Sequence, residues 1–276
     1  MNGSLRPPRT WWRTHADLFV GHMRVNLARY TAYPVAMAFE QLSYLFPLII
    51  SILLWRHLFT KLPRFAGWSF DAVLVLHLFG NLFLALFHAL FMGFHTFAGA
   101  IRCGRIDMWL TRPVDPRIAQ IASMLRPDEL LNRLLGLVPL VLYMAHRGVR
   151  VEPARLAAGL GAMVLGLVAF AVIQLTCACG AFWIARGDAI LSFLDMFYGF
   201  YRFPLNTLPL AAQLVLGLMA PVLLAVTYPA LFATGGADYP TLARVCLASV
   251  ALIVGWWWLH QRIYRMGLKA YQSPGG

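Results

Sequence analysis

The chain has 276 residues, of which 60% are hydrophobic and 12% are charged, with a mean hydropathy of +0.67. Soluble domains carry about 25% charged residues, so this composition excludes an ordinary soluble enzyme or binding module. A net charge of +12 would suggest nucleic acid as a partner of a soluble protein. Here the basic residues flank long apolar runs, which indicates contact with membrane lipid and excludes nucleic acid.

The first 33 residues are polar or amphipathic. Phe19, Met23, Leu27 and Tyr30 share one helical face between residues 11 and 30, and polar side chains occupy another. This spacing predicts a helix that lies along the membrane surface. We therefore divide the chain into a cytoplasmic N-terminus, residues 1–33, and one transmembrane domain, residues 34–276.

Apolar runs then recur along the chain, and together they predict an all-α integral membrane protein with six spans. A run of about 22 residues at 1.5 Å per residue covers about 33 Å, which is enough to cross a bilayer. Ser69 and Asp71 favour the start of the second span, and Pro127 and Pro153 favour the starts of the third and fourth. The predicted spans are residues 34–55, 72–97, 130–145, 154–184, a run that begins near 190, and 241–260.

Two features within these runs concern packing. Ala158, Ala162 and Gly166 lie four residues apart, which predicts close helix approach, either within the chain or to a second subunit. Before the last span, prolines interrupt a long apolar stretch, and each removes a backbone donor. This pattern predicts a broken re-entrant hairpin that enters and leaves one leaflet.

The segment from Gly99 to Arg133 contains six arginines between two apolar runs, so it is an aqueous loop. A central Arg in hydrocarbon would cost about 2.5–3.5 kcal/mol on insertion scales. With both termini inside, the inner segments hold 15 of the 23 lysines and arginines. The positive-inside rule therefore places residues 99–133 and both termini in the cytoplasm.

Few residues suggest chemistry. There is no G-x-x-x-x-G-K-[ST] motif, so we expect no ATP hydrolysis by this chain and no catalytic residue. His77, His88 and His95 fall in the second predicted span, and hydrogen bonding within the bundle is favoured over metal or haem ligation. Glu40, His88 and Asp195 are candidates to line a polar cavity, because intramembrane ionisable groups are functional by default.

Gly104-Arg105-Ile106-Asp107, Leu110 and Arg112-Pro113 resemble the S-G-E-[IL]-D … L-L-x-P signature of ABC-2 type exporter permeases. Cys103 replaces the usual small polar residue, and Arg105 replaces the usual acid. The proline-rich hairpin and the C-terminal Gly267-Leu268 … Tyr271-Gln272-Ser273 extend the resemblance over most of the chain. The nearest subgroup comprises six-span permeases once grouped under an unknown function, which include viologen and multidrug exporters.

The resemblance implies the permease subunit of an ATP-driven exporter in a bacterial plasma (inner) membrane. Such a permease works with a second permease, identical or homologous, and with two copies of an ABC ATPase, which binds the ATP and Mg. A coupling helix around residues 101–109, with Trp109 and Leu110 as apolar anchors, would dock on the ATPase, and the broken hairpin would form an extracellular gate. The implied coupling residues are Ile101, Arg102, Gly104, Arg105, Asp107, Trp109, Leu110, Arg112 and Pro113. The implied gate residues are Pro204, Pro209, Pro221, Tyr228 and Pro229.

Two other functions are compatible with the residues alone. The chain could be a scaffold of a cell-surface or pilus-type assembly without transport of its own. It could also be a haem- or metal-binding membrane protein that uses His77, His88 and His95. A neighbouring P-loop ATPase gene would favour the exporter, whereas a bound metal or a haem absorption band would favour the third function.

Overall fold

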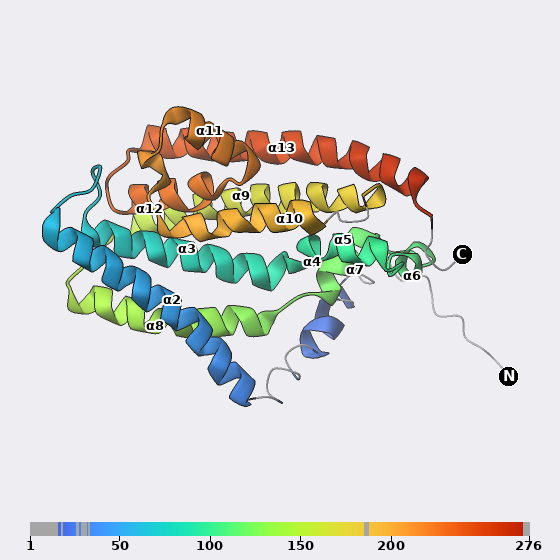
Figure 1. Cartoon of the computed structure of the whole chain (residues 1–276), viewed down its shortest axis with the longest axis horizontal. Coiled ribbons are helices and arrows are strands. Elements are labelled where there is room, and N and C mark those ends of the chain that lie inside the picture. The colour runs from blue at the N-terminus through green and yellow to red at the C-terminus, as the bar shows by residue number, and fades with distance from the viewer. Residues whose placement is uncertain are drawn as a thin grey trace.

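The apolar runs fold into a bundle of roughly parallel helices in the computed structural model (Figure 1). The structure describes residues 34–184 and 188–272, together with 16–17, 19–25, 28 and 32. Residues 19–25 are helical, which agrees with part of the predicted surface helix, and the rest of residues 1–33 lies largely outside the described residues.

Long helices build the bundle, and their starts follow the predicted signals. Ser69 caps one of them by accepting a hydrogen bond from Ala72 N at 3.2 Å, and Pro127 and Pro153 each begin another. Asp238 caps the last helix by accepting from Thr241 N at 3.0 Å. These helices are α2 (Pro34–Lys61), α3 (Phe70–Leu90), α8 (Pro127–His146), α9 (Pro153–Ala178) with η1 (Cys179–Phe182), α10 (Asp188–Asp195) with η2 (Met196–Arg202), and α13 (Tyr239–Ala270).

Among the described residues, four helices are long and apolar enough to cross a membrane, namely residues 35–61, 70–90, 153–182 and 239–270, and a bent helix pair could add a fifth. Helix α8 carries Asp128, Glu129 and Arg133 in its first two turns, which lowers its apolar character. The α10–η2 rod is short, with 8 and 7 residues. The all-helical membrane fold is therefore confirmed, whereas the count of six crossings stays a prediction.

Several helices end at other residues than the predicted spans. The second long helix ends at Leu90 rather than at residue 97, because the backbone leaves helical geometry at Phe91 (φ −116°, ψ 4°) and then bends. The last helix continues to Ala270 rather than stopping at 260. Its final turns are packed, since Tyr264 is buried and Gly267 lies against the ring of Phe182.

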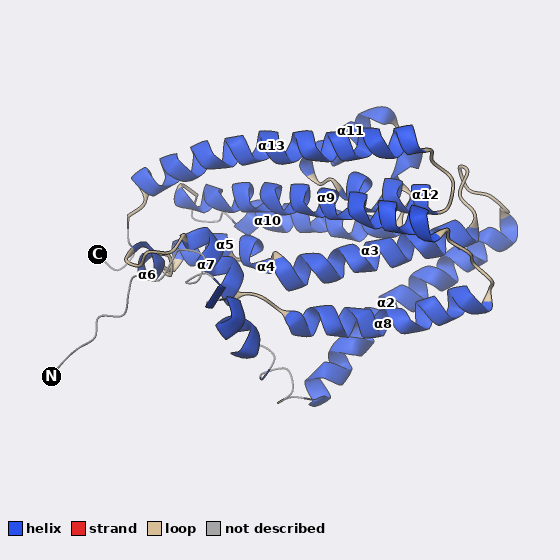
Figure 2. Cartoon of the chain, turned by 180° about the vertical axis from the view of Figure 1, so that it is seen from behind, coloured by secondary structure: helices blue, strands red, loops and turns tan. Residues whose placement is uncertain are grey.

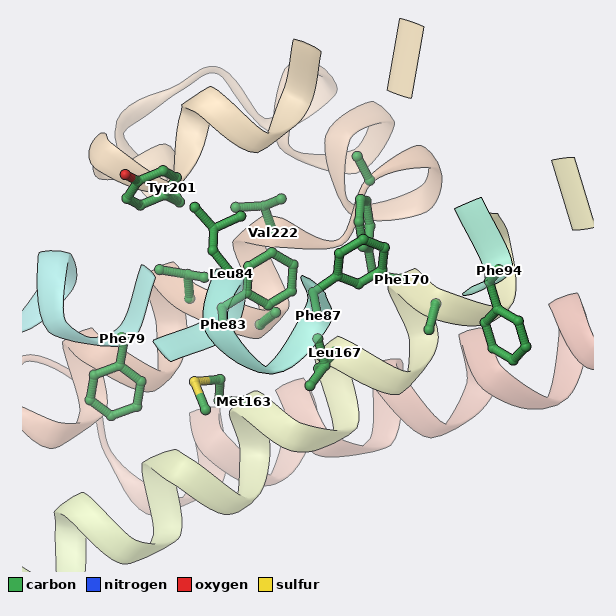
Figure 3. Close-up of a cluster of buried hydrophobic side chains, with 14 of the residues drawn as sticks. Phe79, Phe83, Leu84, Phe87, Phe94, Met163, Leu167, Phe170, Tyr201 and Val222 are labelled. Atoms are coloured by element: carbon green, nitrogen blue, oxygen red, sulfur yellow. The ribbon is translucent and has the colours of Figure 1, made fainter. Parts of the chain in front are cut away.

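The core lies between α3 and α9 (Figure 3). Helix α3 is apolar on almost every face, and 72% of its most apolar stretch is buried, against 11% for α2 and 17% for α13. Phe83 and Phe87 of α3 pack on Phe170 of α9, with ring centroids 5.6 and 5.2 Å apart. Helices α2 and α13 therefore lie on the periphery, where their apolar faces can meet lipid.

The proline-rich stretch forms a broken pair of helices, as predicted. After η3 (Leu205–Thr207), α11 (Leu210–Met219) ends before Pro221, and a π-helical turn, η4 (Leu223–Thr227), continues into α12 (Tyr228–Ala233). The two arms meet at an angle of 97°. Figure 2 shows this pair at the end of the bundle opposite the C-terminus.

The ridge of small residues on α9 faces this broken pair within the same chain. Ala158 and Ala162 pack with Phe232 and Leu242, and Gly166 lies against the backbone of Ala225. The small size of the side chains along the ridge allows the helices to approach closely. The choice that the sequence left open is therefore settled in favour of packing within the chain.

We expect Gly166→Ala to lower the free energy of unfolding by about 1–3 kcal/mol, because overpacking forces the backbone to shift. A Cβ at Gly166 would lie 2.5 Å from Ala225 Cα. The matched control is Gly161→Ala in the same helix, where a Cβ meets nothing within 4 Å. This control should be neutral or stabilising, since alanine is the better helix former. Unfolding of both variants in mixed micelles, followed by tryptophan fluorescence, checks the difference, and equal losses would contradict it.

Candidate coupling surface

Residues 91–126 connect α3 to α8, and we call them the connecting unit. They form four short helices, α4 (Met92–His95), α5 (Phe97–Arg102), α6 (Asp107–Leu110) and α7 (Pro116–Ser123). Figure 2 shows the unit at the end of the bundle near the C-terminus. Asp115 caps α7 by accepting a hydrogen bond from Arg117 N at 2.8 Å, and Pro116 occupies the first turn.

The single helix predicted around residues 101–109 is broken in the structure. Gly104 has φ +70°, a left-handed conformation that ends α5 and turns the chain toward α6. Ile101 and Trp109 are buried inside the unit, with 2% and 6% of their surface exposed. The indole of Trp109 fills the chain's own core, so a docking role for Trp109 stays a prediction.

The remaining predicted side chains form an exposed surface, which we call the tip. Leu110 is 45% exposed and the neighbouring Met108 is 46% exposed. Asp107 and Gly104 are only partly exposed. The tip therefore combines basic and apolar groups, the composition of a surface that can bind a protein with an acidic rim and an apolar groove. Its exposed members are Arg102, Cys103, Arg105, Met108, Leu110, Arg112 and Pro113.

Arg117 joins the buried side of the connecting unit to α13. Its guanidinium binds both carboxylate oxygens of Asp115, and its NH1 group lies 3.1 Å from His260 Nε2. The same guanidinium stacks over the Tyr264 ring at 4.5 Å. A planar, delocalised cation suits such simultaneous pairing and stacking. Burial would raise the pKa of Asp115, but the hydrogen bonds and charge of Arg117 hold that pKa below its usual value, so the pair is ionised at neutral pH.

We expect Arg117→Lys to loosen the connecting unit from α13 while leaving the bundle folded. A lysine keeps the charge but loses the bidentate pairing and the stacking, which should cost about 1–2 kcal/mol. Hydrogen exchange measured by mass spectrometry should show faster exchange in residues 112–124 and 257–265 than in α3. Arg112→Lys at the exposed tip is the control, and equal protection in the two variants would contradict the proposed link.

The connecting unit also touches α10, and two of its own helices pack on each other. His95 Nε2 lies 2.8 Å from Asp195 Oδ2 of α10. Gln120 Nε2 donates to Thr96 Oγ1 at 2.7 Å, which fastens α7 to the end of α4. A Cβ at Gly93 would collide with the backbone of Ile121, so α4 and α7 are in direct contact. These contacts fasten α4 to α7 and attach the connecting unit to α10.

At the start of α8 a charged network links three long helices, and we call it the α2–α3–α8 network. Glu129 is its centre, with 5% of its side chain exposed. It accepts from Arg133 Nε at 3.0 Å and from the Tyr44 hydroxyl of α2 at 2.7 Å. Arg133 also donates to His88 Nδ1 of α3 at 2.8 Å. Each buried charge is therefore hydrogen-bonded, as burial in a membrane protein requires.

Glu40 belongs to the same network. Its carboxylate accepts a hydrogen bond from Asn132 Nδ2 at 2.8 Å. The carboxylate also lies 3.4 Å from the NH2 group of Arg126, which is the last residue of the connecting unit. Gln41 donates to the Asn132 side chain at 2.6 Å. The structure thus brings Glu40 and His88 together and leaves Asp195 apart with His95. Whether the three line a cavity stays a prediction.

The three histidines singled out in the sequence have separate partners. His77 Nε2 lies 2.7 Å from the Ser51 hydroxyl, whereas His88 and His95 bond as described above. Within the described residues, no group of three or more His, Cys, Asp or Glu side chains could hold a metal ion. The gate candidates lie at the other end of the bundle, where Pro204, Pro221 and Pro229 are buried, Tyr228 is half-buried and Pro209 is exposed.

Residues 45–275 match a protein-family model that is described as ABC-2 family transporter protein. This chain belongs to the ABC-2 transporter family. The match spans the connecting unit, the broken pair and the last helix, and it confirms the resemblance carried by the Gly104–Pro113 motif. Searches of curated proteins and of solved structures gave no match. A member of this family is a membrane component of a transporter.

Sequence reasoning missed several residues of this ABC-2 chain that hold its helices together. Arg117 and Arg133 were counted only as inner positive charges, yet each lies in a buried cluster. Tyr44 looked like an ordinary aromatic residue of the first span. The sequence did contain a signal for the α2–α3–α8 network, because four polar residues share one face of an otherwise apolar helix, namely Asp128, Glu129, Asn132 and Arg133. Polar side chains that are buried need hydrogen-bond partners on neighbouring helices.

Proposed function

We propose that this chain is the permease subunit of an ATP-driven exporter, and that the tip of the connecting unit docks on a separate ABC ATPase. Family membership supports the transporter role. The observation that carries the docking proposal is the contrast between the two sides of the connecting unit. One side exposes arginines, Met108 and Leu110, and the other is tied to the long helices.

The proposed arrangement has six crossings, α2, α3, α8, α9, α10–η2 and α13, in a bacterial plasma (inner) membrane. Both termini and the connecting unit face the cytoplasm, where the excess of arginine and lysine falls. Two such chains, identical or homologous, pair around a path, and two ATPase subunits bind ATP and Mg. ATP hydrolysis then belongs to the partner rather than to this chain.

The contacts described above suggest how movement would be transmitted. Arg117 connects the unit to α13, His95 connects it to α10, and Arg126 connects it to α2. A push on the tip would therefore move these helices together, because a packed unit with paired charges transmits displacement. At the far end, α13 lies beside the broken pair, which we propose as the extracellular gate.

A cavity beside that gate is consistent with transport of an amphiphile. A pocket of about 710 Å³ lies between α11, η4, α12 and α13 and is lined almost entirely by apolar residues. Ligand pockets commonly measure about 300–1,000 Å³. The Tyr228 hydroxyl donates a hydrogen bond to Gln213 Oε1 at 3.3 Å, and these two side chains are polar groups in the lining of the pocket.

The test is purification of the tagged chain from membranes that also contain the ATPase encoded nearest to its gene. We expect the two proteins to purify together and the ATPase to hydrolyse ATP faster with the permease than alone. A stable complex with cell-surface proteins and no ATPase would instead support the scaffold alternative and would contradict the exporter.

A further inference from the structure

A narrow groove of about 180 Å³ runs between α2 and α8. Its α2 wall follows a spacing of three and four residues, so the lining side chains form one continuous stripe along the helix. Pro139 and Tyr143 stand on the α8 side. The stripe begins next to the α2–α3–α8 network and consists of Leu45, Leu48, Ile49, Ile52, Leu53 and Arg56.

The groove is apolar along its length and cationic at one end. Ile49 and Leu53 are 49% and 55% exposed, although they line the groove, so its mouth opens to the outside of the bundle. Arg56 is exposed as well, and it makes no hydrogen bond or ion pair with any described residue. An arginine in this position can reach a phosphate through paired N–H groups.

The dimensions match one leaflet of a bilayer. Leu45 and Arg56 are about 16 Å apart along the helix at 1.5 Å per residue. Half of a hydrocarbon core of about 30 Å is about 15 Å. A lipid whose acyl chain starts at Leu45 would therefore place its headgroup level with Arg56. The exposed Lys61 and Arg64 that follow indicate the membrane interface there.

We propose that the α2–α8 groove binds one phospholipid, with an acyl chain along the stripe and the headgroup phosphate on Arg56. The α2–α3–α8 network holds one end of α2 to α8 through Gln41 and Tyr44. The lipid fills the groove between the two helices beyond that attachment. Assignment to the outer leaflet follows from the proposed orientation, whereas the binding site itself does not depend on the proposed function.

The test uses the full chain, purified in mild detergent and stripped of lipid. Native mass spectrometry counts the bound lipid during titration with phosphatidylglycerol, phosphatidylcholine and diacylglycerol, which lacks the phosphate. We expect one tightly bound phospholipid per chain and at least about tenfold weaker binding of diacylglycerol, because a charge-assisted hydrogen bond is lost. Arg56→Gln should weaken phospholipid binding to a similar degree, and Arg56→Lys should restore part of it.

Two further variants keep the result interpretable. Leu53→Trp leaves Arg56 in place and fills the groove at an exposed position, so it should also displace the lipid without unfolding the chain. Arg244→Gln removes an exposed arginine of α13 outside the groove and should leave binding unchanged. Equal loss in Arg56→Gln and Arg244→Gln, unchanged binding in Arg56→Gln and Leu53→Trp, or equal binding of diacylglycerol would each overturn the proposal. Occlusion of the groove by a second copy of the chain, seen as a dimer that excludes lipid, would overturn it too.

Discussion

Glu129→Gln should lower the free energy of unfolding by about 3–5 kcal/mol, the usual cost of removing one partner from a buried charge pair. Arg133 is 11% exposed and depends on Glu129 for its compensating charge. The same substitution weakens the contact with Tyr44 and so frees α2 from α8. Unfolding by SDS in mixed micelles, followed by tryptophan fluorescence, measures the loss.

The control for this prediction is Glu152→Gln. Glu152 also pairs with an arginine one helical turn away, Arg155, at 3.3 Å, but its side chain is 60% exposed. An exposed pair contributes less than about 1 kcal/mol, so the control should lose little. Losses of similar size in the two variants would show that burial does not determine how much the α2–α3–α8 network contributes to the free energy of unfolding.

Leu110→Asp should weaken binding of the ATPase about 30-fold, because an apolar residue central to an interface contributes about 2 kcal/mol. Stimulated ATP hydrolysis should fall in parallel, while the chain still inserts and folds. Leu110 is 45% exposed, so the substitution leaves the core intact. The measurements are surface-immobilised binding of the ATPase and ATP hydrolysis in the reconstituted complex.

Two comparisons make the Leu110 result specific. Leu62→Asp changes a leucine of similar exposure, 47%, at the opposite end of the bundle and should leave the ATPase response unchanged. Trp109→Asp would place a charge in the core and should unfold the connecting unit, so it does not report on docking. Full stimulation in Leu110→Asp would contradict the proposed role of the tip.

The sequence predicted the membrane fold, the helix starts and the broken pair, because these depend on local signals. Ser69 and Pro153 act within a few residues of their own position, and Pro221 lacks the backbone N–H that a continuing helix would need. The span count is harder to obtain, since α8 mixes buried charge with apolar residues and α10–η2 is short. The charged side chains of α8 can be buried only because residues on other helices pair with them.

The candidate site was predicted only in outline. The Gly104–Pro113 motif located the connecting unit, but nothing in its spacing indicates that Trp109 is buried and Met108 is exposed. That difference arises from the turn at Gly104 and from the packing of α6 on α7. Arg117 and His260 are more than a hundred residues apart, so their contact is a property of the tertiary fold rather than of any local pattern.

Accessibility of Cys103 tests the central claim most directly, in a chain whose other three cysteines are replaced by serine. Cys103 is exposed at the tip, beside the arginines proposed to meet the ATPase. A membrane-impermeant maleimide should leave it unmodified in intact cells, modify it in inside-out vesicles, and react much more slowly once the ATPase is bound. Rapid modification from the outside of intact cells would contradict both the orientation and the docking surface.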